Sequence, residues 1–336
     1  MGRGGAAIIA VAGVLAVLAA GAPAALAQDG PEGVLFVAGK RGNTLSKVDL
    51  ANGAEVLRVP SCTNPHELAT SPDGEYVALA CYGGTSVDIF RTGDLAKVAS
   101  IDLGENARPH GIVWHANGDL YATAEGRQSI FWIHDPLGKV ETFEYSTGKQ
   151  GSHMLVVDPS ATTAWTTDLG SKTATRIALQ ARLRIAPISV AVGVEPEGIA
   201  LSPDGKALWV SARGSNQAFE LDPATMEVRN TVATGAFPLR LAIRPQGNVA
   251  ITSDLADGGL TVIDLATAKV IRQIAVSSPQ EAEARQQVTI LWSKDGERVY
   301  VAETASDTVA EVNYASGTVL RRFTAGEGGD GMAILP

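Results

Sequence analysis

Aromatic residues, cysteines and long apolar runs are all scarce in this sequence. Of its 336 residues only 5% are aromatic and two are cysteines, while 45% are hydrophobic. This composition is typical of a globular protein and not of a disordered or collagen-like chain. The net charge of −9 includes no block of five or more like charges. Such an acidic, unclustered distribution argues against nucleic acid and anionic membranes as main partners.

The common catalytic signatures are also absent, because no GxSxG, HExxH, CxxCH or P-loop pattern occurs. The single long apolar run covers residues 6–20, after Arg3 and before the small-residue triplet at residues 25–27. This pattern predicts a signal peptide over residues 1–27, cleaved between Ala27 and Gln28, with a membrane anchor as the alternative. We therefore expect a periplasmic or secreted protein with no membrane span after cleavage and a single domain over residues 28–336.

A period of about 40 residues organises the rest of the chain. Seven copies of one motif, of which PEGIALSPDG is typical, begin at Pro65, Pro109, Ser152, Pro196, Pro238, Gln287 and Asp330. Each complete copy places a short apolar strand before a tight turn, and three further strands follow it. Every repeat is therefore predicted to be a four-stranded antiparallel meander.

The two ends of the chain predict that the repeats close into a ring. Residues 34–59 supply the second, third and fourth strands of a repeat, and the C-terminal GMAIL supplies only a first strand. Together they complete one unit, whereas an open solenoid would leave both partial units unpaired. The predicted fold class is all-β, a seven-bladed β-propeller closed by N-terminal and C-terminal strands in one blade.

The blades resemble YVTN-type repeats, the family of exported and surface-layer propellers that includes YncE-like proteins. The motif PxGIAxSPDG at residues 196–205 and TVIDLATAKVI at residues 261–271 carry this resemblance, which covers residues 33–336. It implies a seven-bladed propeller with its ligand face at the loops entering the first strands, and the family includes both binding proteins and enzymes. The architecture is also similar to that of seven-bladed lactonases and streptogramin-type lyases, although the Pro-Arg-His pattern associated with lactonases is absent.

Histidine recurs at one position of the repeat, seven residues before the turn Asp or its equivalent. Around the predicted ring this position holds His66, His110, His153, Glu197, Leu239, Val288 and Asp330. Three of the five histidines in the sequence therefore share one rim position over the channel. A structural role, in which each histidine caps its strand, is the alternative to a ligand site.

Three imidazoles and a carboxylate form a ligand set suited to Zn, Cu, Fe or Ni. We expect His66, His110 and His153 to converge on one ion or ligand, with Glu197 as fourth ligand or as catalytic base. Asp330 is expected to orient His66 through its other ring nitrogen.

Other polar residues are predicted to lie beside this rim or away from it. Glu67, Arg240 and Thr289 follow the rim position, so pleating should turn them away, although Arg240 can still contact an anionic ligand. Loops on the same face carry residues expected to be solvated, namely Lys40, Arg41, Tyr82, Glu125, Arg127, Asp168, Lys172, Arg213, Asn216, Asp254 and Glu303. His115 and His134 are expected in a turn and on the surface. Residues 279–287 are predicted to form a short helix, either a lid or a tolerated insertion.

The repeat places Cys62 in the loop entering the first complete blade and Cys81 at the end of that blade's second strand. In an oxidising compartment this placement predicts a disulfide, with free thiols or a metal ligand as alternatives.

Three functions are compatible with these patterns. The first is an exported propeller that binds a transition metal or small ligand over the channel. The second is a metal-assisted lyase or lactone hydrolase that uses the same residues. The third is a metal-free scaffold that presents its loop face to a protein partner.

Overall fold

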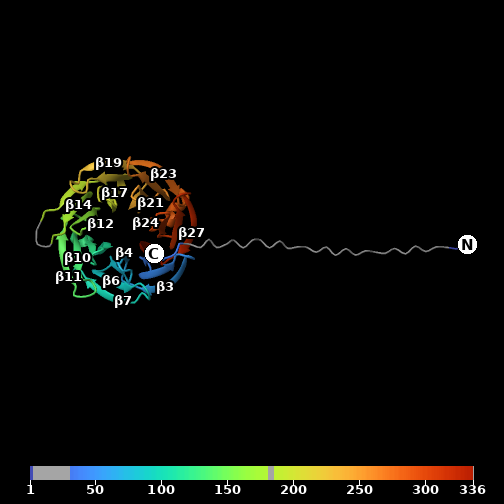
Figure 1. Ribbon diagram of the computed structural model, residues 1–336, viewed down its shortest axis with the longest axis horizontal. Coiled ribbons are helices and arrows are strands. Elements are labelled where there is room, and N and C mark those ends of the chain that lie inside the picture. Colours follow the sequence, from blue (N-terminus) through green and yellow to red (C-terminus); the bar gives the residue numbers. More distant parts are fainter. Residues whose placement is uncertain (3–30, 181–184, 336) are drawn as a thin grey trace.

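A computed structural model of the chain describes residues 1–2, 31–180 and 185–335, and its strands form seven four-stranded sheets arranged in a ring (Figure 1). The predicted seven-bladed β-propeller is confirmed. Blades 1 to 6 follow one another along the chain from Pro65, and blade 7 combines the first three strands of the chain with its last strand. The predicted signal peptide lies almost entirely outside the described residues. No helix in the described ranges is long and apolar enough to cross a membrane.

The innermost strands, from blade 1 to blade 7, are β4 (Pro65–Thr70), β8 (Pro109–Trp114), β12 (Ser152–Val157), β16 (Pro196–Leu201), β20 (Pro238–Ile243), β24 (Gln287–Trp292) and β28 (Gly329–Leu335). The second strands, in the same order, are β5 (Tyr76–Cys81), β9 (Leu120–Ala124), β13 (Thr163–Asp168), β17 (Leu208–Ala212), β21 (Val249–Asp254), β25 (Arg298–Glu303) and β1 (Val34–Gly39).

The third strands are β6 (Ser86–Arg91), β10 (Ser129–His134), β14 (Thr173–Ala178), β18 (Gln217–Leu221), β22 (Gly259–Asp264), β26 (Thr308–Asn313) and β2 (Thr44–Asp49). The outermost strands are β7 (Lys97–Asp102), β11 (Glu141–Ser146), β15 (Ile188–Ala191), β19 (Val228–Ala233), β23 (Lys269–Ala275), β27 (Thr318–Thr324) and β3 (Ala54–Pro60). Two short 3₁₀ turns, Glu125–Arg127 and Arg213–Ser215, follow β9 and β17.

The position of each strand in its blade follows from its side chains. The second strand is buried on both faces, as in β5 and β17, because neighbouring blades cover it on either side. The outermost strand alternates between exposed and half-buried residues, as in β3. The apolar core therefore lies between blades, where for example Ile89 of blade 1 and Ile112 of blade 2 belong to one cluster.

The ring closes as predicted, through antiparallel pairing of β1 with β28, in which Val34 pairs with Leu335 and Val37 with Met332. The approach of β28 to β4 requires a glycine. A Cβ atom on Gly331 would lie 2.2 Å from the His66 carbonyl oxygen, closer than any real contact.

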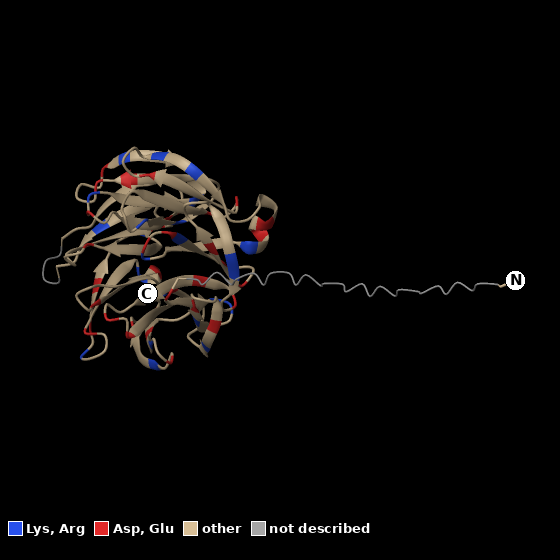
Figure 2. Cartoon of the chain, turned by 45° about the vertical axis from the view of Figure 1, so that its right-hand side comes forward, with Lys and Arg blue, Asp and Glu red and all other residues tan. Residues whose placement is uncertain are grey.

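The predicted short helix is confirmed as α1 (Pro279–Arg285), which stands out from the ring in Figure 2. Ser278 begins it with a capping box, in which the Ser278 side chain and Glu281 satisfy each other's backbone N–H groups. Arg285, in its last turn, donates to the carboxylate of Glu303 in blade 6. These contacts tie the helix to its own blade.

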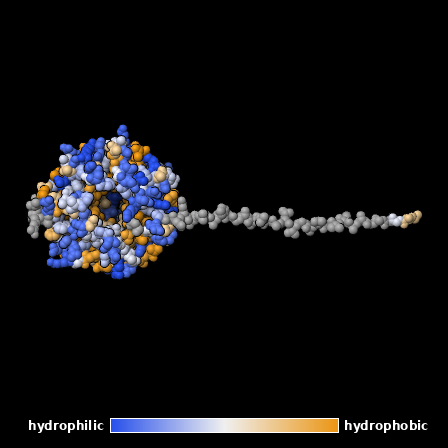
Figure 3. Space-filling view, in the orientation of Figure 1, coloured by the Kyte–Doolittle hydropathy of each residue, from blue (hydrophilic) through white to orange (hydrophobic). Residues whose placement is uncertain are grey.

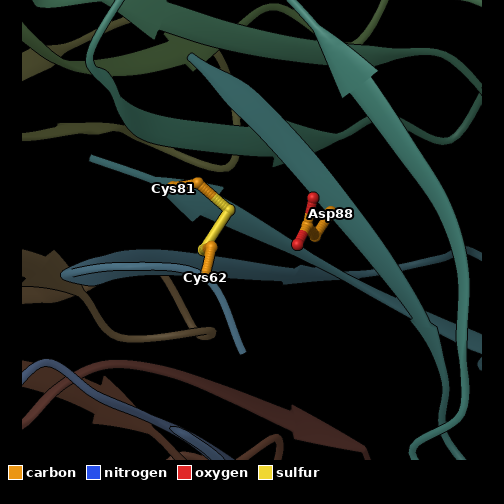
Figure 4. Close-up of side chains that lie close together, drawn as sticks. All are labelled: Cys62, Cys81 and Asp88. Atoms are coloured by element: carbon orange, nitrogen blue, oxygen red, sulfur yellow. A yellow bond between two sulfur atoms is a disulfide. The ribbon is translucent and has the colours of Figure 1, made fainter. Parts of the chain in front are cut away.

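The predicted disulfide between Cys62 and Cys81 is confirmed, with Asp88 close to it on the neighbouring strand (Figure 4). Its loop includes Asn64, the carbonyl of which accepts a hydrogen bond from His66 Nδ1 at 3.0 Å. The bridge thus anchors the loop that enters β4 to the end of β5.

Removal of this disulfide should destabilise the fold without destroying it. A bridge that closes about 19 residues constrains the unfolded chain, so Cys62→Ala/Cys81→Ala is expected to lower the free energy of unfolding by about 3 kcal/mol. Urea unfolding of the two proteins measures this loss, and thiol titration of the denatured, unreduced wild type should detect no free thiol. Two titratable thiols would disprove the bridge.

Candidate active site at the channel mouth

Each innermost strand carries a β-bulge at its second and third residues, where two residues face one on the neighbouring strand. In blade 1 the pairing changes between Pro65↔Cys81 and Leu68↔Leu79, and the same shift occurs in all seven blades. A bulge interrupts the pleat and re-aims side chains. Both residues of the bulge can therefore approach the centre of the ring.

This bulge overturns the prediction that pleating turns Glu67 and Arg240 away from the rim. Arg240 of blade 5 donates to Glu67 of blade 1 at 2.7 Å and to Glu197 of blade 4. All three side chains are buried. The guanidinium therefore joins distant blades across the channel mouth. Figure 3 shows a hydrophilic hollow at the centre of the ring.

The three rim histidines come together as a row of mutually tilted rings. The ring centroids of His66 and His110 are 4.7 Å apart, and those of His110 and His153 are 3.6 Å apart. Tyr82, in the loop after β5, lies beside the first two, with its centroid 4.4 Å from that of His66. Side-chain packing of this kind holds each imidazole in one orientation.

His153 is held between two carboxylates. Its Nδ1 lies 3.1 Å from Glu125 and its Nε2 lies 3.3 Å from Glu197. Burial lowers the pKa of His153, but the hydrogen bonds to Glu125 and Glu197 outweigh burial and raise it above its ordinary value. An imidazolium that donates both N–H groups accounts for this geometry.

Glu197 is the most strongly bound acid of the cluster, because Arg240, Arg213 and His153 all contact its carboxylate. Burial alone raises its pKa, yet Arg240 and His153 bring the pKa down to about 2. A carboxylate this acidic and fully occupied is a poor proton acceptor at neutral pH. The geometry therefore assigns Glu197 to holding Arg240 and His153 in place, and does not favour the role of base predicted from the sequence.

His66 has the opposite character. Burial lowers its pKa to about 4, so its ring is neutral at pH 7. Because the Asn64 carbonyl can only accept, His66 Nδ1 carries the proton, and Nε2 keeps its lone pair. Nε2 lies 3.8 Å from Asp330 Oδ2, too far for the predicted direct hydrogen bond. Asp330 instead accepts a hydrogen bond from Lys40 at 3.0 Å.

Several buried polar atoms of the cluster have no hydrogen-bond partner among the described residues: His110 Nδ1, Arg240 Nε, Asp330 Oδ1 and Thr289 Oγ1. Buried polar groups are normally paired, so these atoms are available to a polar ligand. Arg240 Nε offers a donor, and Asp330 Oδ1 offers an acceptor. Burial, followed by repulsion from the charged His153, lowers the pKa of His110 well below its ordinary value, so this ring is also neutral.

The geometry does not place the three histidines and Glu197 as a ready metal centre. Among residues 31–180 and 185–335, the one group of three potential ligands close enough to share an ion is Cys62, Cys81 and Asp88, and its sulfur atoms are bonded to each other. A metal at the rim would require His153 to leave its two carboxylates. The predicted Zn, Cu, Fe or Ni site stays a prediction.

In four blades, the residue directly after the second strand also joins the cluster. These residues are Lys40, Tyr82, Glu125 and Arg213. Lys40 contacts Asp330, Glu125 contacts His153 and Arg213 contacts Glu197, while Tyr82 contacts Glu125. Tyr82 donates to Glu125 at 3.2 Å, and Arg108 binds the Tyr82 hydroxyl in turn. The repeat spacing that located the histidines could have located this position too.

The remaining polar residues at this face serve their own blades or lie outside the cluster. Asp168, Asp254 and Glu303 end second strands and are buried beneath Ser, Thr or Arg side chains of the same blade. Arg41 pairs with Asp307, and Arg127 pairs with Glu144. The Asn216 side chain accepts from the Phe237 backbone. As expected, His115 lies in a turn and His134 on the surface, with a side chain that is 53% exposed.

Asp254 should give the fold a pH dependence of its own. Burial raises its pKa to about 7, although Thr261 and Thr252 donate to it. Because an unfolded Asp titrates near pH 4, the folded state binds this proton more tightly, and stability is lost as the pH rises from about 4 to about 7. The wild type should therefore lose a few kcal/mol of unfolding free energy between pH 5 and pH 8, and Asp254→Asn should abolish this difference. Urea unfolding at the two pH values measures it. In the control Asp264→Asn, at the half-buried end of β22, the wild-type difference should persist.

Comparison with known proteins identifies the family. A model of lactonases with the seven-bladed β-propeller fold matches residues 42–270, more than half of the chain. The chain belongs to this lactonase family. It does so although its blades lack the Pro-Arg-His pattern expected of lactonases, and the resemblance to YVTN-type repeats stays a prediction. No curated protein matches the sequence of this lactonase-family chain closely enough to count as a relative.

Solved structures of similar fold accompany the family match, all at low sequence identity. The periplasmic gluconolactonase of Pseudomonas aeruginosa superposes with a TM-score of 0.70 at 17% identity, over 90% of this chain and 99% of that one. An inactive His-to-Ala variant of virginiamycin B lyase from Staphylococcus aureus, with quinupristin, gives 0.66 at 16% identity, over 83% and 93%. Hydrazine synthase of Kuenenia stuttgartiensis gives 0.72 at 16% identity, over 89% and 99%. At these identities the similarity concerns the fold alone.

Proposed function

We propose that this protein is an exported lactone hydrolase that acts on cyclic esters of polyhydroxylated acids at the channel mouth. The observation that carries the proposal is the neutral His66, whose Nε2 lone pair faces Asp330 beside the guanidinium of Arg240. Membership of the lactonase family supports the reaction class. The N-terminal sequence and the disulfide support export, because disulfides persist in oxidising compartments.

The first step needs a base and a water molecule. His66 Nε2 and Asp330 Oδ2 are both acceptors and lie 3.8 Å apart, so a water that donates one hydrogen to each would fit between them. His66 takes a proton from this water as its oxygen bonds to the lactone carbonyl carbon. The burial that keeps His66 neutral makes it a weak base, so Asp330 contributes by stabilising the imidazolium that forms.

The second step needs a hydrogen-bond donor that stabilises the negative oxyanion and a proton for the leaving oxygen. The N–H at Arg240 Nε is buried and has no partner among the described residues, so it can donate to the oxyanion of the tetrahedral intermediate. When the ring C–O bond breaks, the imidazolium of His66 returns its proton to the leaving alkoxide. The product is the open hydroxy acid, and His66 is neutral again.

Polyhydroxylated substrates suit this site because its lining is polar. His110 Nδ1 and Asp330 Oδ1 are buried atoms that substrate hydroxyls can pair with. The glutamates and arginines of the cluster already form ion pairs with each other, so they position the lining of the site and neutralise each other's charge. A neutral, hydroxyl-rich ring fits such a lining better than an apolar one.

A pH-stat assay on the purified protein without a tag tests the proposal. δ-Gluconolactone and γ-galactonolactone, as six-membered and five-membered rings, are compared with an unsubstituted δ-lactone before and after dialysis against a chelator. We expect hydrolysis above the buffer rate that prefers the hydroxylated rings and survives chelation. A rate equal to that of buffer for all three lactones would contradict the proposal, and activity that chelation abolishes and Zn²⁺ restores would favour the metal-assisted alternative.

A further inference from the structure

A groove of about 490 Å³ lies between blades 1 and 2, at the opposite end of the strands from the channel mouth. Its walls are the turn after β4, the end of β8 with the turn that follows, and the end of β10. The five steps along the strand from His66 to Ser71 separate it from His66 by about 17 Å. It is therefore a site distinct from the histidine cluster.

Two aromatic rings form one wall of this groove. Tyr76 and Trp114 lie nearly parallel, with an interplanar angle of 29° and ring centroids 6.4 Å apart. The indole N–H of Trp114 donates to the Gly118 carbonyl, which holds the ring in place. An ordered ring of this kind can stack against the apolar face of a ligand at little cost in conformational entropy.

One partly exposed tryptophan lines this groove. Of the five tryptophans in the sequence, Trp165, Trp209 and Trp292 are buried in the blades. The other two are partly exposed, and Trp114 is the one that lines the groove. Trp132 packs in the cluster between blades 2 and 3 and stacks on Phe143 with centroids 4.9 Å apart.

A fixed polar group lies against the aromatic wall. His134 Nδ1 donates to Asp119 at 2.8 Å, and Trp132 and Asn117 also donate to this buried carboxylate. The hydrogen bond to Asp119 raises the pKa of His134. Since Nδ1 is occupied, the exposed Nε2 of His134 is the atom available to a ligand, alongside the carboxylates of Asp73 and Asp135.

The equivalent groove between blades 4 and 5 shows which of these features are special. It has a similar size, about 450 Å³, and the same Ser-Pro-Asp turn at residues 202–204. Ala207 stands there in the place of Tyr76, and no aromatic side chain lines it among the described residues. The aromatic wall and the His134–Asp119 pair are thus additions to a cleft that the blades form anyway.

We propose that the groove between blades 1 and 2 binds a neutral sugar chain. Among the described residues, no Lys or Arg lines it, which disfavours an anionic ligand. Asp119 is already paired with His134, which weakens the case for a cationic one. A pyranose ring matches both the aromatic and the polar side chains of the groove. Its C–H face can stack on Trp114 and Tyr76. Its hydroxyls can pair with His134, Asp73 and Asp135.

Isothermal titration of the intact protein with hexamers of cellulose, chitin, xylan and amylose tests this proposal, with tetramethylammonium chloride as the cationic probe. We expect one hexamer to bind with a Kd in the micromolar to millimolar range, and Trp114→Ala to weaken it at least tenfold. His134→Gln, an exposed change that should not perturb folding, should weaken binding severalfold. Lys206→Ala, in the groove between blades 4 and 5, should leave it unchanged.

Three results would overturn the proposal: no hexamer binds, tetramethylammonium binds in their place, or both groove variants bind as tightly as the wild type. Lactone hydrolysis at the channel mouth should be the same in Trp114→Ala and in the wild type. The groove and the proposed function therefore succeed or fail independently.

Discussion

Replacement of His66 by glutamine is expected to lower kcat for lactone hydrolysis by about 10²- to 10³-fold, because the substitution removes the proposed base. Glutamine keeps a side chain of similar polarity that can donate to the Asn64 carbonyl, so the strand and the contact with His110 should persist. KM should change little, since His66 is not the main contact to the substrate hydroxyls. Steady-state kinetics with δ-gluconolactone measures both constants.

The pH profile separates a base from a merely structural residue. The pKa of His66 is about 4, so kcat/KM of the wild type should rise as the pH increases through about 4 and then level off towards neutrality. The His66→Gln variant should lack this rise. The matched control is His115→Ser, because serine holds the same turn position in blades 1 and 4, as Ser71 and Ser202. Wild-type kcat in His66→Gln, or a large loss in His115→Ser, would contradict the assignment.

Replacement of Arg240 by methionine should cost about 3–5 kcal/mol of stability, the usual penalty for leaving a buried charge without its partner. Arg240 is buried and contacts the carboxylates of Glu67 and Glu197 from different blades. Methionine fills much of the same volume, so the loss would come from Glu67, which loses its guanidinium, and from Glu197, which keeps only that of Arg213. Urea unfolding at pH 7 measures it.

Three comparisons make this prediction specific. Arg58→Met breaks the partly exposed pair with Glu55 and should cost only about 0–1 kcal/mol. Arg240→Met/Glu67→Gln should recover part of the loss, because one of the two carboxylates is then neutral. Burial already raises the pKa of Glu67 in the wild type, and loss of Arg240 should raise this pKa further, so the single variant should lose less stability relative to the wild type as the pH falls. Equal losses in Arg58→Met and Arg240→Met would refute the buried network.

The fold could be predicted because the same sequence pattern occurs in every repeat. Turn chemistry, apolar strands and the split blade at residues 34–59 and 329–335 all point to the same closed ring, and β1 pairs with β28 accordingly. The meeting of His66, His110 and His153 also follows from spacing, since equal repeat positions lie at equal depth. Local strand propensity and global topology agree throughout the chain, so the strands and their order could be predicted with few alternatives.

The site's chemistry could not be predicted in the same way, because it depends on local departures from the repeat's geometry. If side chains alternated strictly along the strand, those of Glu67 and Arg240 would point away from the channel. The bulge instead turns them towards the centre of the ring. Whether His153 is a ligand or an ion-pair partner depends on Glu125, which reaches it from a neighbouring loop. Burial then makes His66 and His110 neutral while two carboxylates keep His153 charged, so three identical residues have different chemistry.

A crystal structure of the protein with the δ-lactam of gluconic acid, which resists hydrolysis, tests the central claim most directly. The account predicts that the lactam carbonyl oxygen accepts a hydrogen bond from Arg240 Nε and that its hydroxyls contact His110 or Asp330. A water molecule should lie between His66 Nε2 and Asp330, next to the carbonyl carbon. A lactam bound elsewhere on the propeller, or one at the channel mouth with its carbonyl turned away from both Arg240 and His66, would contradict it.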